Sequence, residues 1–180
     1  GMVATIVITG IATYFAIDLA QLSGFTSDEN AYLNFATDGR IDMIGLLFGG
    51  IMIGLLGVLY DSAIGQAVAV EELFTAGKDY TRAQVYTRAI RIGREHIGAL
   101  VNTLAIAYVG ASLPLLLLLK QSTASPLYIL NGEVFATEII RILMSSIGII
   151  LAVPVTTLIA TYMLKGTRPS GIHSHTHPAT

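Results

Sequence analysis

Residues 41–73 decide the fold of this chain, and they read IDMIGLLFGGIMIGLLGVLYDSAIGQAVAVEEL. Between Met43 and Tyr60 the stretch contains no charged residue and is rich in glycine. A helix needs roughly 20 apolar residues to cross the ~30 Å hydrocarbon core of a bilayer. A run of this length without charge is typical of a membrane-spanning helix.

Three further blocks have the same character, and they cover about residues 3–22, 97–119 and 139–164. Hydrophobic residues make up 53% of the chain and charged residues 12%, whereas an average soluble domain has about 25% charged residues. The mean hydropathy is +0.70. None of the blocks alternates apolar and polar residues as β-barrel strands do. The sequence therefore predicts an all-α, polytopic transmembrane bundle of about four spans, formed by a single domain over residues 1–165.

Composition excludes several classes of function. A net charge of −2, with no basic run that alternates with aromatic residues, argues against a nucleic-acid partner. The absence of cysteine excludes disulfides, thiolate zinc sites and thiol nucleophiles. No nucleophile–base set or phosphate-binding loop is present, so we expect neither an enzyme nor a cofactor. The alternating histidines of the tail at 166–180 are interpreted as part of a flexible terminus rather than a metal site; they are His173, His175 and His177.

Basic residues set the expected orientation. Most of them lie in the loop over residues 61–96 or follow the last span, namely Lys78, Arg82, Arg88, Arg91, Arg94, Lys165 and Arg168. Because positive residues favour the cytoplasmic side, this loop and both termini are predicted to be cytoplasmic. Within the loop, one helix is expected to continue to Ala76 and to end at Gly77. A second helix from Thr81 either lies in the membrane interface as an amphipathic helix or is an ordinary connection.

The second block places small residues and an acid on one helix face. Gly50, Gly54, Gly57 and Asp61 follow one another at steps of four, three and four. Glycines allow helices to approach closely in lipid, so this face is expected to pack against another helix. Asp61 is interpreted either as a carboxylate that handles protons or cations, or as a boundary residue that is hydrated at the membrane edge.

Polar residues near Asp61 extend the hypothesis of a lined path. Ser62, Gln66 and Glu72 continue the same helix, and Asn102 lies in the third block. Asn102 has an alternative role as a hydrogen-bonding contact between helices. The fourth block carries small and hydroxyl residues on one face, which favours packing, and Pro154 predicts a kink.

Three segments resemble the YibE/F-like family of bacterial membrane proteins. They are GLLFGGIMIGLLGVLYDSAIGQAVAVEEL from Gly45, IGREHIGALVNTLAIAYVGASLPLLLLL from Ile92, and NGEVFATEIIRILMSSIGIILAVPVTTLIA from Asn131. The resemblance extends from about Ile41 to Ala160. It implies a multi-pass protein of the bacterial inner membrane, whose members are usually longer and carry two adjacent acids where Tyr60 and Asp61 stand. This chain would then correspond to the C-terminal half, and its expected partners are the bilayer and either further subunits or the missing N-terminal half.

A weaker local likeness links GLLGVLYDSAI to the spans of resistance–nodulation–division exporters and of SecD/SecF translocase subunits. There an acid at the position of Asp61 takes part in a proton relay, and Ser62 stands where a second acid can occur. Two hypotheses follow. The first is a permease or translocase subunit coupled to protons through Asp61, and the second is a scaffold or assembly subunit that packs partners through its small residues.

Overall fold

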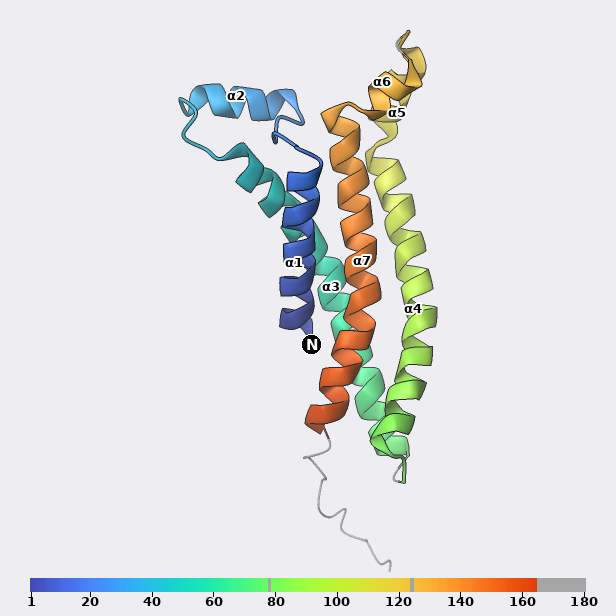
Figure 1. Ribbon diagram of the computed structural model, residues 1–180. Helices are drawn as coiled ribbons and strands as arrows, with labels where there is room; N and C mark the ends of the chain where they lie inside the picture. Colours follow the sequence, from blue (N-terminus) through green and yellow to red (C-terminus); the bar gives the residue numbers. More distant parts are fainter. Residues whose placement is uncertain (78, 124, 165–180) are drawn as a thin grey trace, which may run out of the picture.

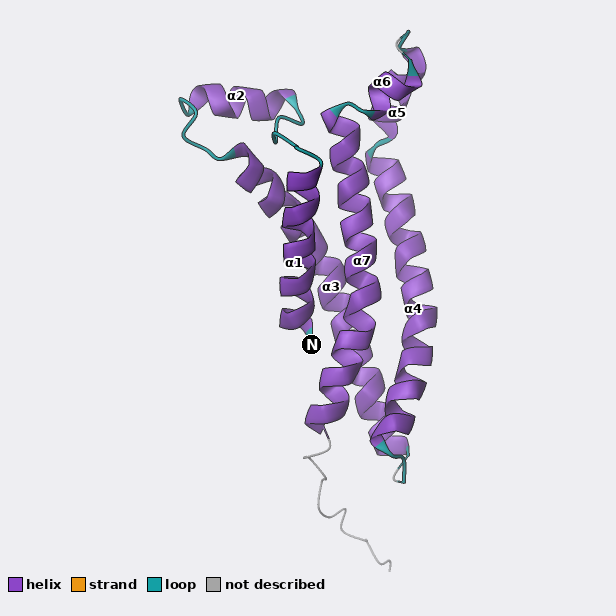
Figure 2. Cartoon of the chain, in the orientation of Figure 1, coloured by secondary structure: helices purple, strands orange, loops and turns teal. Residues whose placement is uncertain are grey.

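The computed structural model describes residues 1–77, 79–123 and 125–164, and every regular element in these ranges is a helix (Figure 2). The helices are α1 (Met2–Leu19), α2 (Asp28–Ala36), α3 (Met43–Ala76), α4 (Arg82–Ala111), α5 (Leu113–Gln121), α6 (Pro126–Leu130) and α7 (Glu133–Met163). The predicted all-α bundle is confirmed.

The four long helices α1, α3, α4 and α7 run up and down beside one another (Figure 1). Helix α7 packs against each of the other three. The short helices α2, α5 and α6 lie at the same end of the bundle, α2 on one side and α5 and α6 on the other (Figure 1). The other end, where α3 turns into α4, carries the arginines of the first half of α4, and it is called the basic end below.

In the described part of the chain, α1, α3 and α7 are each long and apolar enough to cross a membrane. The span predicted over residues 97–119 is interrupted, because α4 and α5 meet at 58°. Together they make a fourth span if the bent pair crosses as one unit. Pro114 follows the break at Ser112, where it cannot donate the backbone hydrogen bond that would continue α4.

The segment between the second and third spans differs in part from the prediction. Helix α3 ends at Ala76 with Gly77 as its C-cap, as expected. Thr81 begins α4 through a capping box in which Thr81 and Gln84 bond each other's backbone N–H. However, α4 then continues without a break to Ala111, so the segment after Thr81 is the first part of one long helix rather than a separate interfacial or connecting helix.

A small apolar core at the basic end explains why the first part of α4 packs against α3 and α7. Val70 of α3, Val85 and Ala89 of α4, and Ala160 of α7 are buried together. The apolar stripe of the first half of α4 is therefore covered by α3 and α7 rather than by lipid. Gly93 is buried on the same side of α4, whereas Ile92 is 48% exposed.

At the opposite end, one carboxylate connects α1 to α7. The side chain of Glu133, the first residue of α7, accepts hydrogen bonds of 2.7 Å from the backbone N–H of Ser23, from Ser23 Oγ and from the N–H of Gly24. Gly24 has a φ of +86° and packs directly on the backbone of Met43, so it can carry no side chain.

Helix α2 lies beyond the end of α1 and is capped at its own start. Ser27 accepts a hydrogen bond from the backbone N–H of Asn30. A hydrogen bond from Ser27 also lowers the pKa of the Glu29 carboxyl below its ordinary value, and the backbone N–H of Glu29 adds to this effect. The acid in the first turn thus stays ionised, which favours the N-terminus of the helix.

Candidate functional site

Helix α3 has one face in the core and one face on the surface. Its core face is formed by Leu47, Ile51, Leu55 and Leu59, which are nearly fully buried. The opposite face carries Gly50, Gly54, Gly57 and Asp61, all exposed. This exposed set is called the glycine face below. A Cβ added at any of its three glycines would meet no other atom within 4 Å.

The glycine face therefore contacts no other helix in the described part of the chain. The sequence places the three glycines and Asp61 on one face, but within this chain that face lies opposite to the packed one. Any helix that packs against these glycines comes from outside the described residues.

Asp61 lies inside an apolar surface rather than at its edge. On the exposed side of α3, Leu56 and Tyr60 precede it, and Ile64 and Val68 follow it toward the basic end. These four residues are 40–52% exposed. The next exposed acids on α3 are Glu71 and Glu72, roughly 15 Å further along the helix.

Ser62 and Gln66 lie on the core side of α3, away from Asp61. Five residues separate Asp61 from Gln66, which turns the side chain by roughly 140° about the helix axis. Gln66 is 3% exposed and Ser62 is fully buried. The structure thus brings Ser62 and Gln66 into the bundle and leaves Asp61 and Glu72 on its surface.

Gln66 connects three helices through one amide group. Its Nε2 donates to the carbonyl oxygen of Ala89 in α4 at 2.9 Å and to Thr157 Oγ1 in α7 at 2.7 Å. Because a carbonyl oxygen only accepts, the amide orientation is fixed by Ala89. Thr157 in turn donates to the Val153 carbonyl at 2.6 Å, so its hydroxyl both accepts and donates a hydrogen bond.

Gly93 allows α4 to approach this amide. A Cβ at position 93 would lie 2.6 Å from Gln66 Oε1 and would also clash with Val153 Cγ1. The three helices therefore meet at one crossing formed by Gln66, Gly93 and Val153. In this chain Gln66 acts as a contact that holds the helices together.

The seam between α1 and α7 contains buried hydroxyl groups that sequence reasoning did not single out. Thr5, Thr9 and Thr13 are fully buried at steps of four along α1. The signal was present in the sequence as this regular spacing. Thr9 packs against Gly148 of α7, where a Cβ would lie 3.2 Å from Thr9 Cγ2.

Several of these hydroxyl groups have no hydrogen-bond partner. Among the described residues, Thr9 Oγ1, Ser62 Oγ, Thr137 Oγ1 and Thr156 Oγ1 are buried and unpaired. They come from α1, α3 and α7. Ser62 is the only one of them that the sequence placed in the predicted path.

Asn102 lies on α4 and is exposed. No hydrogen bond from its side chain is formed within the described residues, so here it makes no hydrogen-bonded contact between helices. The titratable side chain of α4 that approaches α3 is His96. Its Nε2 lies 3.7 Å from the Cβ position of Gly65, one turn after Asp61.

An ion pair lies near the start of α7. Arg141 Nη1 donates to Glu138 Oε1 at 2.6 Å, three residues apart on α7. In the described ranges it is the one salt bridge. No group of three or more histidine, cysteine, aspartate or glutamate side chains within those ranges has the geometry of a metal site. The histidines of the tail lie outside the described residues.

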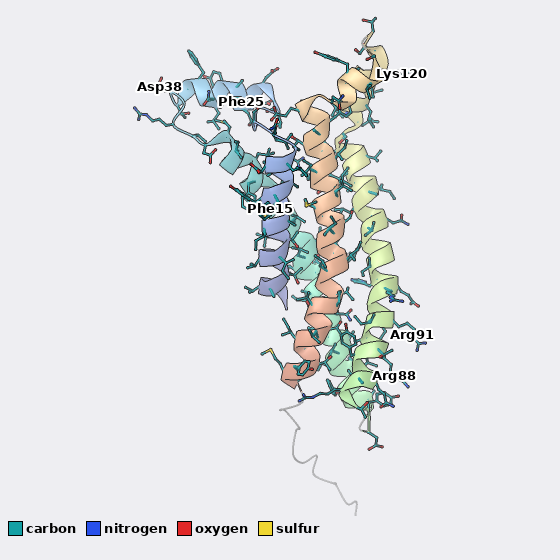
Figure 3. The ribbon with its side chains drawn as sticks, viewed as in Figure 1. Phe15, Phe25, Asp38, Arg88, Arg91 and Lys120 are labelled. Atoms are coloured by element: carbon teal, nitrogen blue, oxygen red, sulfur yellow. The ribbon has the colours of Figure 1, made fainter. Side chains whose placement is uncertain are left out.

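Four arginines occupy the first half of α4, and they differ in their contacts. The guanidinium of Arg82 lies over the ring of Tyr162 at 5.3 Å, and that of Arg88 over Tyr80 at 4.3 Å. Arg91 and Arg94 are exposed and have no ion-pair or ring partner in the described part of the chain. Figure 3 shows Arg88 and Arg91 on the outer side of α4 near the basic end.

Comparison with known proteins identifies the chain at the level of the family. The profile of the YibE/F-like protein family matches residues 1–166. The match includes α1, whereas the resemblance read from the sequence began at about Ile41. No curated protein and no solved structure matches the chain. With apolar helices long enough to cross a bilayer and a profile match over nearly its whole length, this membrane protein belongs to the YibE/F-like family.

Proposed function

We propose that this chain is a permease- or translocase-type subunit in which Asp61 takes up and releases protons. One observation carries the proposal: Asp61 lies on the exposed glycine face of α3, with apolar exposed residues both before and after it. It is thus a carboxyl group within the surface that lipid or another protein covers.

An ionised carboxylate in this position costs free energy when lipid surrounds it. An ionised aspartate costs about 2.5–3.5 kcal/mol at the centre of a bilayer-spanning helix and less toward the ends of the helix. The cost falls when the group is protonated or when a neighbouring helix supplies hydrogen-bond donors. A group whose charge depends on its surroundings in this way is suited to proton transfer.

The glycine face indicates how such surroundings arise. Its three glycines leave room for close approach of a second helix, and none is used within the described chain. In the proposal, that helix comes from a further subunit or from an N-terminal half, and it covers Asp61 during the transport cycle. Of the predicted path residues, Gln66 keeps the structural role described above.

The test compares Asp61→Asn with Asp38→Asn in inverted membrane vesicles, which retain partner proteins. Asp38 is exposed at the opposite end of the molecule and has a φ of +52°, which asparagine tolerates. A potassium diffusion potential is imposed, and internal pH is followed with a fluorescent dye. We expect chain-dependent proton movement in the wild type, a loss of about 100-fold or more in Asp61→Asn through removal of its general acid–base group, and no change in Asp38→Asn.

The alternative function is a scaffold or assembly subunit. The glycine face, which no helix of the described chain covers, supports a scaffold as much as it supports a proton carrier. The two functions differ at Asp61. A scaffold tolerates asparagine there, whereas a proton carrier requires the ionisable group. Equal proton movement in the wild type and Asp61→Asn, or none in either, therefore contradicts the proposal and leaves the scaffold.

A further inference from the structure

We infer that Arg91 and Arg94 of α4 form a binding site for the headgroups of anionic phospholipids at the basic end of the bundle. The inference is independent of the proposed role of Asp61. It rests on the orientation of the two side chains, on their lack of partners and on their distance from the apolar part of α4.

Both arginines face away from the bundle. The buried residues of this half of α4 are Val85, Ala89 and Gly93, which define the side in contact with α3 and α7. Arg91 and Arg94 lie roughly 140–160° around the helix from Ala89. Their guanidinium groups therefore point into the surroundings, and the exposed Thr87 shares this outward face.

The charges of these two arginines are not neutralised within the described chain. Arg82 and Arg88 each lie over a tyrosine ring, while Arg91 and Arg94 have neither a ring nor a carboxylate. Helices α3 and α4 also carry exposed acids near this end, namely Glu71, Glu72 and Glu95. None of these acids forms an ion pair with Arg91 or Arg94. Two unpaired guanidinium groups one turn apart on a helix are suited to phosphate, which arginine binds through two parallel hydrogen bonds.

Their position is at the edge of the apolar region. Arg94 follows Gly93, which packs on Val153 within the apolar part of α7. The uncharged run of the third block begins at Ile97, only three residues after Arg94, a rise of roughly 4.5 Å. Arg91 lies one turn further out. In the inference, the lipid phosphates lie at these two positions, beside the start of the uncharged run of α4.

The same side of the helix offers a surface for acyl chains. Beyond Ile97, α4 exposes Ile106 and Val109, which are 73% and 58% exposed. A phospholipid with its phosphate at Arg91 and Arg94 has its chains beside these residues. A soluble phosphate compound lacks that second contact, so the surface fits a lipid better than a free anion.

The experiment uses the full chain in detergent and native mass spectrometry with equimolar phosphatidylglycerol and phosphatidylcholine. We expect the wild type to retain phosphatidylglycerol preferentially. A basic residue near an anionic membrane contributes about 1 kcal/mol, so Arg91→Gln/Arg94→Gln is expected to weaken this binding by roughly 30-fold. The matched control Arg40→Gln removes a charge from an exposed loop at the opposite end and is expected to bind as the wild type does.

Three results overturn the inference. The first is equal retention of the two lipids by the wild type, which needs no variant to fold. The second is an equal loss of binding in Arg40→Gln and in the double variant. The third is displacement of phosphatidylglycerol by millimolar inorganic phosphate, which assigns the two arginines to a soluble anion. Retention of lipid selectivity in Arg91→Lys/Arg94→Lys, with loss in the glutamine variant, supports a site that depends on charge.

Discussion

At the scale of single residues, Gly93 determines how closely α4 can approach α3 and α7. Any Cβ at this position meets Gln66 Oε1 at 2.6 Å and Val153. We expect Gly93→Ala to destabilise the protein by about 1–3 kcal/mol, because the side chains of a packed crossing must move. The control is Gly98→Ala on the same helix, where a Cβ meets nothing within 4 Å.

Heat-induced loss of monodisperse protein, followed by size-exclusion chromatography, measures the difference. Gly98→Ala is expected to be neutral or stabilising by up to about 1 kcal/mol, since alanine favours a helix. Equal midpoints for the two variants would show that the crossing is not tightly packed.

The roles of single residues were only partly predictable. The period of an α-helix showed that Asp61 shares a face with the glycines, and the structure agrees. Periodicity does not say which face meets a neighbour, so it could not show that Gln66, a predicted path residue, bonds Ala89 and Thr157. That contact joins residues 91 positions apart, and no local pattern reports it.

At the scale of elements, glycines on α3 and α7 have opposite consequences. A Cβ at Gly148 of α7 would lie 3.0 Å from Leu59 Cδ2 and 3.2 Å from Thr9 Cγ2, whereas one at Gly54 of α3 meets nothing. We expect Gly148→Ile to lower stability by about 1–3 kcal/mol, because it pushes α1 and α3 away from α7. Gly54→Ile is expected to keep the stability of the chain and to reduce its association with neighbouring proteins.

The measurement combines the heating midpoint with the yield of chemical crosslinking in membranes. Unchanged crosslinking in Gly54→Ile would show that the glycine face packs against no partner. A loss of stability in Gly54→Ile equal to that in Gly148→Ile would show that a helix of the same chain already covers this face.

The elements themselves were largely predictable, with one instructive exception. Uncharged runs gave the spans, and Gly77 and Thr81 gave the turn between α3 and α4. The first half of α4 looked amphipathic because one of its sides is apolar. The sequence cannot show whether lipid or protein covers such a side, and here Val70 and Ala160 cover it.

At the scale of the whole molecule, the two ends of the bundle are expected on opposite sides of the membrane. The chain has no cysteine, so single cysteines report accessibility without background. Asp38→Cys and Thr87→Cys place one exposed thiol at each end. The positive-inside rule predicts that an impermeant maleimide labels the first in intact cells and the second only after permeabilisation. Labelling of Thr87→Cys in intact cells would reverse the orientation.

The uninterrupted length of α3 has a mechanical consequence. With 34 residues and neither proline nor break, it extends roughly 50 Å, more than the hydrocarbon thickness. By contrast, α7 contains Pro154, and α4 stops at a bend. Helix α3 is therefore the longest unbroken helix in the described part of the chain. A partner that tilts α3 at the glycine face would also move Gln66. This movement would change the contacts that Gln66 makes with α4 and α7.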